Sequence, residues 1–193
     1  MECGPVTGHN VLGRAYALTV MTPIVAGHEI ALRAQLRSLP SAAESPFARV
    51  PSTHFARWVI IPQPAFQGPP MRPDPFKSEY LVFTSSFDGD LGSYLGDLCL
   101  LMGDRADQVW SHCVGYPGSA DPWAFARYLR HNQVNTDVFF AAYPDATVDQ
   151  IRASLARRDQ ILAFALESQG MDGAEIHRRW TETFAAGVRA RHP

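Results

Sequence analysis

Two short stretches of the sequence bring a histidine, an arginine and an aspartate into a pattern that suits acid–base chemistry. His54 and Arg57 lie in THFARWVII, and Asp88 lies in the acidic turn FDGD. Histidine titrates near neutral pH and serves as a proton acceptor or donor. Arginine carries a permanent charge in a planar fork that holds carboxylates or phosphates. These three residues are therefore candidates for a catalytic site.

The spacing of these residues limits how they can cooperate. On one strand, side chains three positions apart point to opposite faces, so His54 and Arg57 share a pocket only if a bulge intervenes. Asp88 could pair with Arg57, or with His112 across the strand ends. In the alternative interpretation, each residue fills a structural role with a local partner. Asp90 and Asp121 are interpreted as the N-caps of the helices that follow them.

A second group of candidates, His112, Cys113 and Tyr116, lies where a helix ends before a Gly-Tyr-Pro turn. His112 could act as a proton shuttle or haem ligand, or it could cap the last carbonyls of its helix. Neighbouring residues on a helix diverge by about 100°, so His112 is poorly placed to activate Cys113 as a nucleophile. Tyr116 completes the list of catalytic candidates.

No metal site is predicted from the sequence. The three cysteines show no CxxC spacing, and Asp88 and Asp90 have no third carboxylate nearby. His28 and His131 fall at helix ends and are interpreted as caps. His177 lies on the final amphipathic helix, where a half-exposed surface position is the plain interpretation.

Composition narrows the class of protein. The chain has 193 residues, of which 46% are hydrophobic and 19% charged, and this suits one globular domain. A net charge of −2 gives no electrostatic case for binding nucleic acid or an anionic membrane. No apolar run approaches the roughly 18 residues of a membrane span. The first residues do not resemble a signal peptide, so we expect a cytoplasmic protein.

Periodicity predicts four strands separated by helices. The strands are expected at residues 16–22, 53–61, 79–86 and 136–142. Helices are expected at about 30–39, 91–102, 104–113, 122–131 and 147–166, and a last helix after Gly170 carries Ile176 to Val188 on its apolar side. Six prolines between Pro62 and Pro75 make that stretch a loop or linker. We expect a flexible N-terminus over residues 1–15 and one domain over 16–193, with a C-terminal helical extension over about 147–190.

The order β-α-β-β-α-β predicts a ferredoxin-like α+β fold with a four-stranded antiparallel sheet. The helices of such a fold cover one face of the sheet. The second and fourth strands are apolar on both faces, so the other face needs a cover. A face-to-face homodimer would supply one, and a ligand would supply another. Aromatic residues such as Trp58 and Phe83 could line a pocket for a flat apolar ligand.

The segments THFARWVII, LVFTSSFDGDLGSYL and VWSHCVGYPG resemble a module associated with dye-decolourising-peroxidase-like bacterial proteins. The resemblance spans roughly residues 16 to 165 and places the chain in the dimeric α/β-barrel superfamily. Dye-decolourising peroxidases carry a GxxDG motif whose aspartate assists peroxide cleavage. The corresponding stretch here is Ser85–Gly89, with serine in place of the first glycine.

The resemblance implies an oxidoreductase that binds haem, or a flat apolar substrate, over the open sheet face. His54, Arg57, Asp88, His112 and Tyr116 are then the catalytic candidates. As cofactor-binding residues it implies His177, in the position of an axial haem ligand, together with Trp58 and Phe83. Two alternatives stay open. One is a non-catalytic binding or oligomerisation module. The other is a cofactor-free isomerase or cyclase acting on an aromatic or polyketide-like substrate.

Overall fold

A computed structural model describes residues 9–63, 68–70 and 77–184 of the chain. The chain divides into two compact units, Met1–Asp149 and Gln150–Pro193. The predicted flexible segment 1–15 and the proline-rich stretch 62–75 lie partly outside the described residues. Within the described ranges, no helix is both long enough and apolar enough to cross a membrane.

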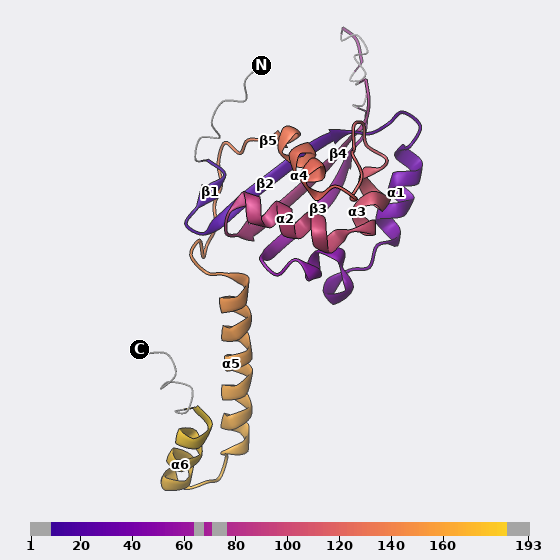
Figure 1. Cartoon of the computed structure of the whole chain (residues 1–193). Helices are drawn as coiled ribbons and strands as arrows, with labels where there is room; N and C mark the ends of the chain where they lie inside the picture. Colours follow the sequence, from indigo (N-terminus) through magenta and orange to yellow (C-terminus); the bar gives the residue numbers. More distant parts are fainter. Residues whose placement is uncertain (1–8, 64–67, 71–76, 185–193) are drawn as a thin grey trace. The chain divides into compact units, whose positions relative to one another are not determined.

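The first unit is an α+β structure built on an open antiparallel sheet (Figure 1). The predicted α+β class is confirmed, but the sheet has five strands where four were predicted. Its strands are β1 (Val11–Leu12), β2 (Ala15–Pro23), β3 (Thr53–Ile61), β4 (Tyr80–Asp88) and β5 (Gln133–Val134). The long strands lie in the order β2-β4-β3, and both β1 and β5 pair with the free edge of β2. The predictions for β2, β3 and β4 are confirmed to within two residues.

Four α-helices of this unit lie on one side of the sheet (Figure 1). They are α1 (Glu29–Ser38), α2 (Leu91–Met102), α3 (Asp104–Trp110) and α4 (Pro122–His131), with short 3-10 helices at Ala42–Glu44 and Pro46–Arg49. The N-caps predicted at Asp90 and Asp121 are confirmed. The Asp90 carboxylate accepts from the Ser93 N–H at 3.0 Å, and Asp121 accepts from the Trp123 N–H at 3.0 Å.

An aromatic core lies between the sheet and these helices. Alternate residues of β4 point into it, and Phe83 and Phe87 are fully buried. The Phe83 ring meets Trp110 edge to face, with centroids 5.5 Å apart, while Phe87 stacks on Tyr94 at 3.7 Å. Because β4 is the central strand, its side chains hold the helices to the sheet.

The prediction of a fourth strand at 136–142 is wrong. Strand β5 pairs Val134 with Thr19, so a continued strand would place residue 136 opposite Ala17. That position on the edge of β2 is already occupied, because the Ala17 N–H donates to the Asn10 carbonyl at 2.8 Å. The Thr136 N–H donates instead to the Asn10 side chain at 2.8 Å. Strand β1, absent from the prediction, therefore excludes the longer strand.

A glycine makes this edge arrangement feasible. Gly13, in the turn between β1 and β2, has φ +59°. A Cβ at this position would lie 2.9 Å from the Pro144 carbonyl oxygen. The Arg14 and Ala15 N–H groups donate to the same carbonyl, at 2.8 and 3.1 Å. The chain after β5 is thus held against the β1–β2 turn.

The second unit contains most of α5 (Val148–Glu167) and all of α6 (Gly173–Phe184). An aromatic cluster forms between the two helices. The Phe164 ring lies 5.4 Å from Trp180 and 5.5 Å from Phe184. The Arg157 guanidinium lies over the Phe184 ring, 4.9 Å from its centroid. The unit is therefore a helical hairpin with a small core of its own.

We predict that Phe83→Ala lowers the free energy of unfolding by about 3–5 kcal/mol, because it empties the centre of the aromatic core. Phe140→Ala is the matched control, since Phe140 is 82% exposed and lies in the segment that is not a strand. It should change stability by less than about 0.5 kcal/mol. Urea denaturation of both variants measures the difference. Equal losses would contradict the described core.

Candidate functional site

The face of the sheet opposite the helices is organised as rows of side chains that run across β3, β4 and β2. Pairing places Phe55, Ser86 and Ala17 in one row. The next row consists of Arg57, Thr84 and Thr19. Beyond these, Val59, Val82 and Met21 form an apolar row. Aromatic, polar and aliphatic side chains thus succeed one another along this helix-free face.

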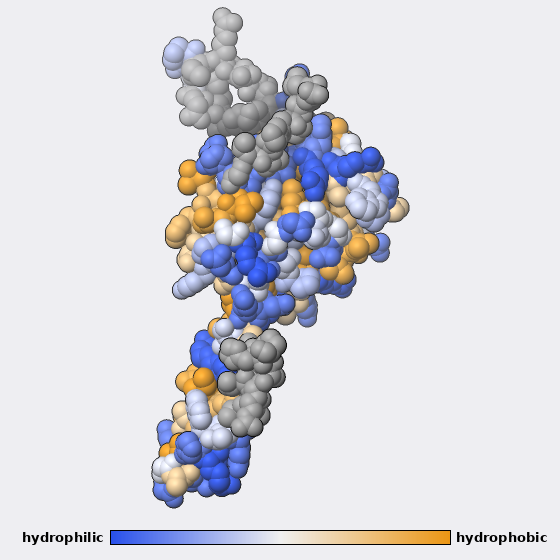
Figure 2. Space-filling model, turned by 60° about the vertical axis from the view of Figure 1, so that its left-hand side comes forward, coloured by the Kyte–Doolittle hydropathy of each residue, from blue (hydrophilic) through white to orange (hydrophobic). Residues whose placement is uncertain are grey.

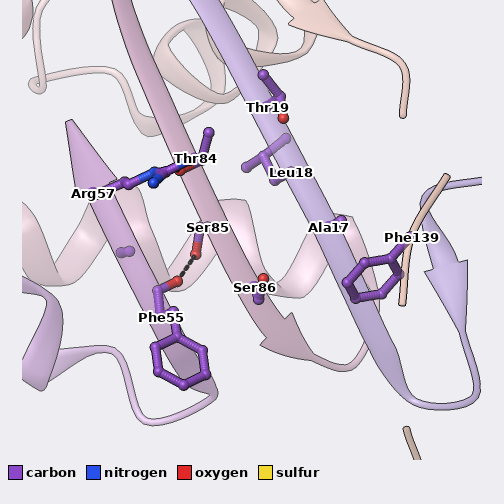
Figure 3. Close-up of a pocket in the computed structure, with 10 residues that line it drawn as sticks. Ala17, Leu18, Thr19, Phe55, Arg57, Thr84, Ser85, Ser86 and Phe139 are labelled. Atoms are coloured by element: carbon purple, nitrogen blue, oxygen red, sulfur yellow. Dashed lines mark hydrogen bonds between the residues drawn. The ribbon is translucent and has the colours of Figure 1, made fainter. Parts of the chain in front are cut away.

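A groove of about 490 Å³ lies on the first two rows (Figure 3). Two phenylalanine rings flank it, Phe55 from β3 and Phe139 from the segment after β5, with Ser86 and Ala17 between them (Figure 3). The other lining residues are Leu18, Thr19, Ala56, Arg57, Thr84 and Ser85. Ligand pockets usually measure about 300–1,000 Å³, so the groove has room for a small molecule.

Small side chains explain why the sheet is hollowed here. Ala17 and Thr19 on β2 and Thr84 and Ser86 on β4 occupy alternate positions that face away from the core. Their neighbours on the core side include the large Leu18 and Phe83, both fully buried. Strands β2 and β4 therefore carry large side chains on the helix side of the sheet and small side chains on the groove side.

Arg57 is the charged group of the groove. Its Nε donates to the Thr84 hydroxyl at 3.1 Å, which holds the guanidinium over β4. No acidic side chain forms an ion pair with Arg57 in the part of the chain that the structure describes. Its remaining N–H donors are suited to the two oxygens of a carboxylate or sulfonate.

His54 and Asp88 form a pair next to the row of Phe55 and Ser86, which line the groove. The pairing of β3 with β4 shifts between Thr53 and Phe55, so His54 is the extra residue of a bulge. Asp88 follows Ser86 by two positions and shares its face. His54 Nε2 lies 3.3 Å from Asp88 Oδ1, and both side chains are largely buried. The bulge thereby brings His54 toward the face that carries Arg57.

Asp88 has a second partner in the backbone. Its Oδ1 atom accepts from the Val148 N–H at 2.9 Å, at the first residue of α5. An anionic side chain is stabilised at the N-terminus of a helix. The Asp88 carboxylate is thus held in place from two sides, and it orients the His54 ring.

His112 lies at the other end of the sheet and pairs with His28, not with Asp88. The two Nδ1 atoms are 3.2 Å apart. Burial, and secondly the neighbouring His28, lower the pKa of His112. His28 occupies the N-cap position of α1, but its side chain makes no capping hydrogen bond. The predicted capping role of the His28 side chain is therefore wrong.

Tyr116 belongs to a hydrogen-bond network that fixes the loop after α3. Its hydroxyl donates to Asp107 at 2.8 Å, and the Ser119 N–H donates to the same oxygen at 2.9 Å. Burial would raise the pKa of Asp107, but hydrogen bonds from Ser119 and Tyr116 hold it below its ordinary value. Burial and the charge of Asp107 raise the pKa of Tyr116. Tyr116 keeps its proton at neutral pH and lies away from the groove lining.

The three residues predicted to bind a cofactor are not gathered at the groove. Phe83 is fully buried on the helix side, and Trp58 packs against it with ring centroids 5.9 Å apart. His177 is exposed on α6, in the second unit. The structure thus pairs His54 with Asp88, places Arg57 in the groove lining, and leaves the other predicted residues elsewhere.

The cysteines within the described residues are poor nucleophiles. Burial raises the pKa of Cys99 to about 12. Burial also raises the pKa of Cys113 to about 11, although its sulfur accepts a hydrogen bond from Thr22 at 3.3 Å. Both thiols stay protonated at neutral pH and contribute to the core.

Neither the small residues of the groove nor Phe139 is predicted from the sequence to line a pocket. The sequence does contain a pattern that indicates the small lining residues. On two strands, Ala17, Thr19, Thr84 and Ser86 alternate with large apolar residues. No comparable signal marked Phe139, whose position depends on the loss of the predicted fourth strand. The chain matches no protein-family model, no curated protein and no solved structure.

We predict that Asp88→Ala lowers the free energy of unfolding by about 1–3 kcal/mol, because the Val148 N–H and His54 both lose their acceptor. Asp88→Asn should cost less, since its amide oxygen can still accept from Val148. Asp97→Ala, which removes an exposed carboxylate from α2, serves as the control. Urea denaturation compares the three variants. If Asp88→Asn and Asp88→Ala lower the free energy of unfolding equally, the hydrogen bond from the Val148 N–H contributes nothing to stability.

Proposed function

We propose that this protein binds a small, flat, largely apolar molecule with an acidic group, and that His54 exchanges a proton with it. The observation that carries the proposal is a groove with the Arg57 guanidinium in its lining, next to which the His54–Asp88 pair follows the Phe55–Ser86 row along the strands. The rings of Phe55 and Phe139 would contact the flat body of the ligand. Arg57 would hold its acidic group.

Strand geometry supports proton exchange at this place. Asp88 lies two residues beyond Ser86 on β4, which is about 7 Å along the strand. His54 directly precedes Phe55, one of the two phenylalanines that flank the groove. A histidine whose one nitrogen contacts a carboxylate has the other nitrogen for a substrate proton. We infer a cofactor-free isomerase or cyclase, acting on an aromatic or polyketide-like acid.

Haem fits these residues less well. Haem iron is commonly held by a histidine nitrogen. His112 lies at the end of the sheet away from the groove, and His54 is held against Asp88 outside the groove lining. His177 belongs to the other unit, and Trp58 and Phe83 lie on the helix side of the sheet. The oxidoreductase implied by the resemblance remains a proposal, for which a Soret band on addition of haemin would be the supporting result.

The sheet order also supports the proposed dimeric α/β-barrel class. Strands β5, β2, β4 and β3 are antiparallel neighbours in that order, as in a ferredoxin-like sheet. Phe55 is 78% exposed and Val59 43% exposed on the helix-free face. Orange patches on the surface of the first unit show that further hydrophobic residues face outward (Figure 2). We propose that a second copy packs on this face and closes the groove.

We predict that anilinonaphthalene sulfonate, a flat apolar anion, binds the native protein with increased fluorescence. Arg57→Met should weaken binding about tenfold, because the sulfonate loses its cationic partner. Ser86→Phe should abolish binding by filling the groove. His54 imidazole resonances should shift when the probe is added, and those of His131 should not. Fluorescence titration and NMR spectroscopy measure these effects.

Arg37→Met is the matched control for the probe experiment, since Arg37 is exposed on α1. It should leave the affinity unchanged, and circular dichroism should show each variant folded. If Ser86→Phe binds the probe as well as the natural sequence does, the groove is not the binding site. If the probe binds but His54 resonances stay in place, the role of His54 in proton exchange is excluded.

We predict that sedimentation at micromolar concentration shows a dimer. Val59→Glu should shift it toward monomer, because it places a charge in the apolar row of the proposed interface. Ile30→Glu, at a residue 84% exposed on α1, should leave the dimer intact. A monomer for the natural sequence would exclude the face-to-face assembly, while the binding proposal would still be decided by the probe.

A further inference from the structure

Two histidines meet at the end of the sheet that lies away from the groove. His28 lies at the N-cap of α1, and His112 follows α3 by two residues. Their Nδ1 atoms are 3.2 Å apart, while the ring centroids are 5.2 Å apart at an interplanar angle of 74°. Since the nitrogens are closer than the ring centres, the two Nδ1 edges face each other.

Backbone hydrogen bonds hold both residues independently of their side chains. The Val25 N–H donates to the His112 carbonyl at 2.9 Å, and the His28 N–H donates to the Val25 carbonyl at 2.9 Å. The Val114 N–H donates to the Pro23 carbonyl, also at 2.9 Å. The segments on both sides of the pair are therefore fixed by their main chains, and the imidazoles are brought together in advance of any ligand.

The separation of the nitrogens fits one shared metal ion. Imidazole nitrogens bind Zn²⁺ at about 2.0–2.1 Å in tetrahedral geometry, which places two of them about 3.3 Å apart. The observed 3.2 Å is close to that value. We propose that His28 and His112 together bind one transition-metal ion through their Nδ1 atoms.

The neighbourhood defines the kind of site. Within the described ranges, no group of three or more His, Cys, Asp or Glu side chains could hold a metal. The protein therefore supplies two ligands, and water completes the coordination. Of the ions that imidazole suits, Cu²⁺ should bind most tightly, followed by Ni²⁺.

The experiment is calorimetric titration of the full chain, prepared without a histidine tag, with CuSO₄, NiCl₂ and ZnCl₂ near neutral pH. We expect one ion per chain at this site, bound most tightly for Cu²⁺. His28→Gln and His112→Gln should each weaken the binding at least about tenfold, because each removes one ligand. His131→Gln removes an exposed histidine from the end of α4 and should leave the affinity unchanged.

Electron paramagnetic resonance of the Cu²⁺ complex gives a second readout. The natural sequence should show coupling to the nitrogens of two imidazoles, and each single variant coupling to one. If circular dichroism shows that a variant is unfolded, the spectrum of the natural protein decides alone. Fewer than two imidazoles in that spectrum, or unchanged affinity in both folded variants, would show that the pair is only a hydrogen bond between two rings.

Discussion

The difference between the two faces of β4 is the constraint on which the rest of the first unit depends. This strand lies between β2 and β3, so its core-side residues occupy the centre of the face that the helices cover. Its core side carries Phe83 and Phe87, which are fully buried against Trp110 and Tyr94. Its other side carries only small polar residues at the groove. The same alternation that builds the core therefore leaves room for a ligand on the opposite face.

The edge of β2 decides which segment borders this groove. Strand β1 occupies the part of the edge next to the turn at Gly13, and β5 occupies only two positions further along. The chain after β5 cannot extend the sheet, because its hydrogen-bonding partners on β2 are already taken. It passes instead beside Ala17, where Phe139 lines the groove. A two-residue strand thus determines the second aromatic wall of the candidate site.

Local sequence patterns were sufficient to predict those elements whose own residues indicate their secondary structure. The bounds of β3, and the N-caps Asp90 and Asp121, follow from alternation and from short polar residues before apolar stripes. The run 136–142 has a strand-like composition as well, yet its state depends on competition with Asn10 and β1, which are distant in sequence. The contact between His54 and Asp88 depends on a one-residue bulge, for which the sequence carries no signal. Pairing between His28 and His112 likewise joins residues far apart in the chain.

The His28–His112 pair and the His54–Asp88 pair lie at opposite ends of the same sheet. Pro23 pairs with Tyr80 near the His28–His112 end, and Ala15 pairs with Asp88 at the other, eight residues along each strand. That separation is about 26 Å, so charge on one pair is largely screened from the other at physiological salt. The chemistry of each pair is therefore set by its own neighbours. A carboxylate faces His54, which suits proton transfer, whereas a second imidazole faces His112, which suits a shared electrophile such as a metal ion.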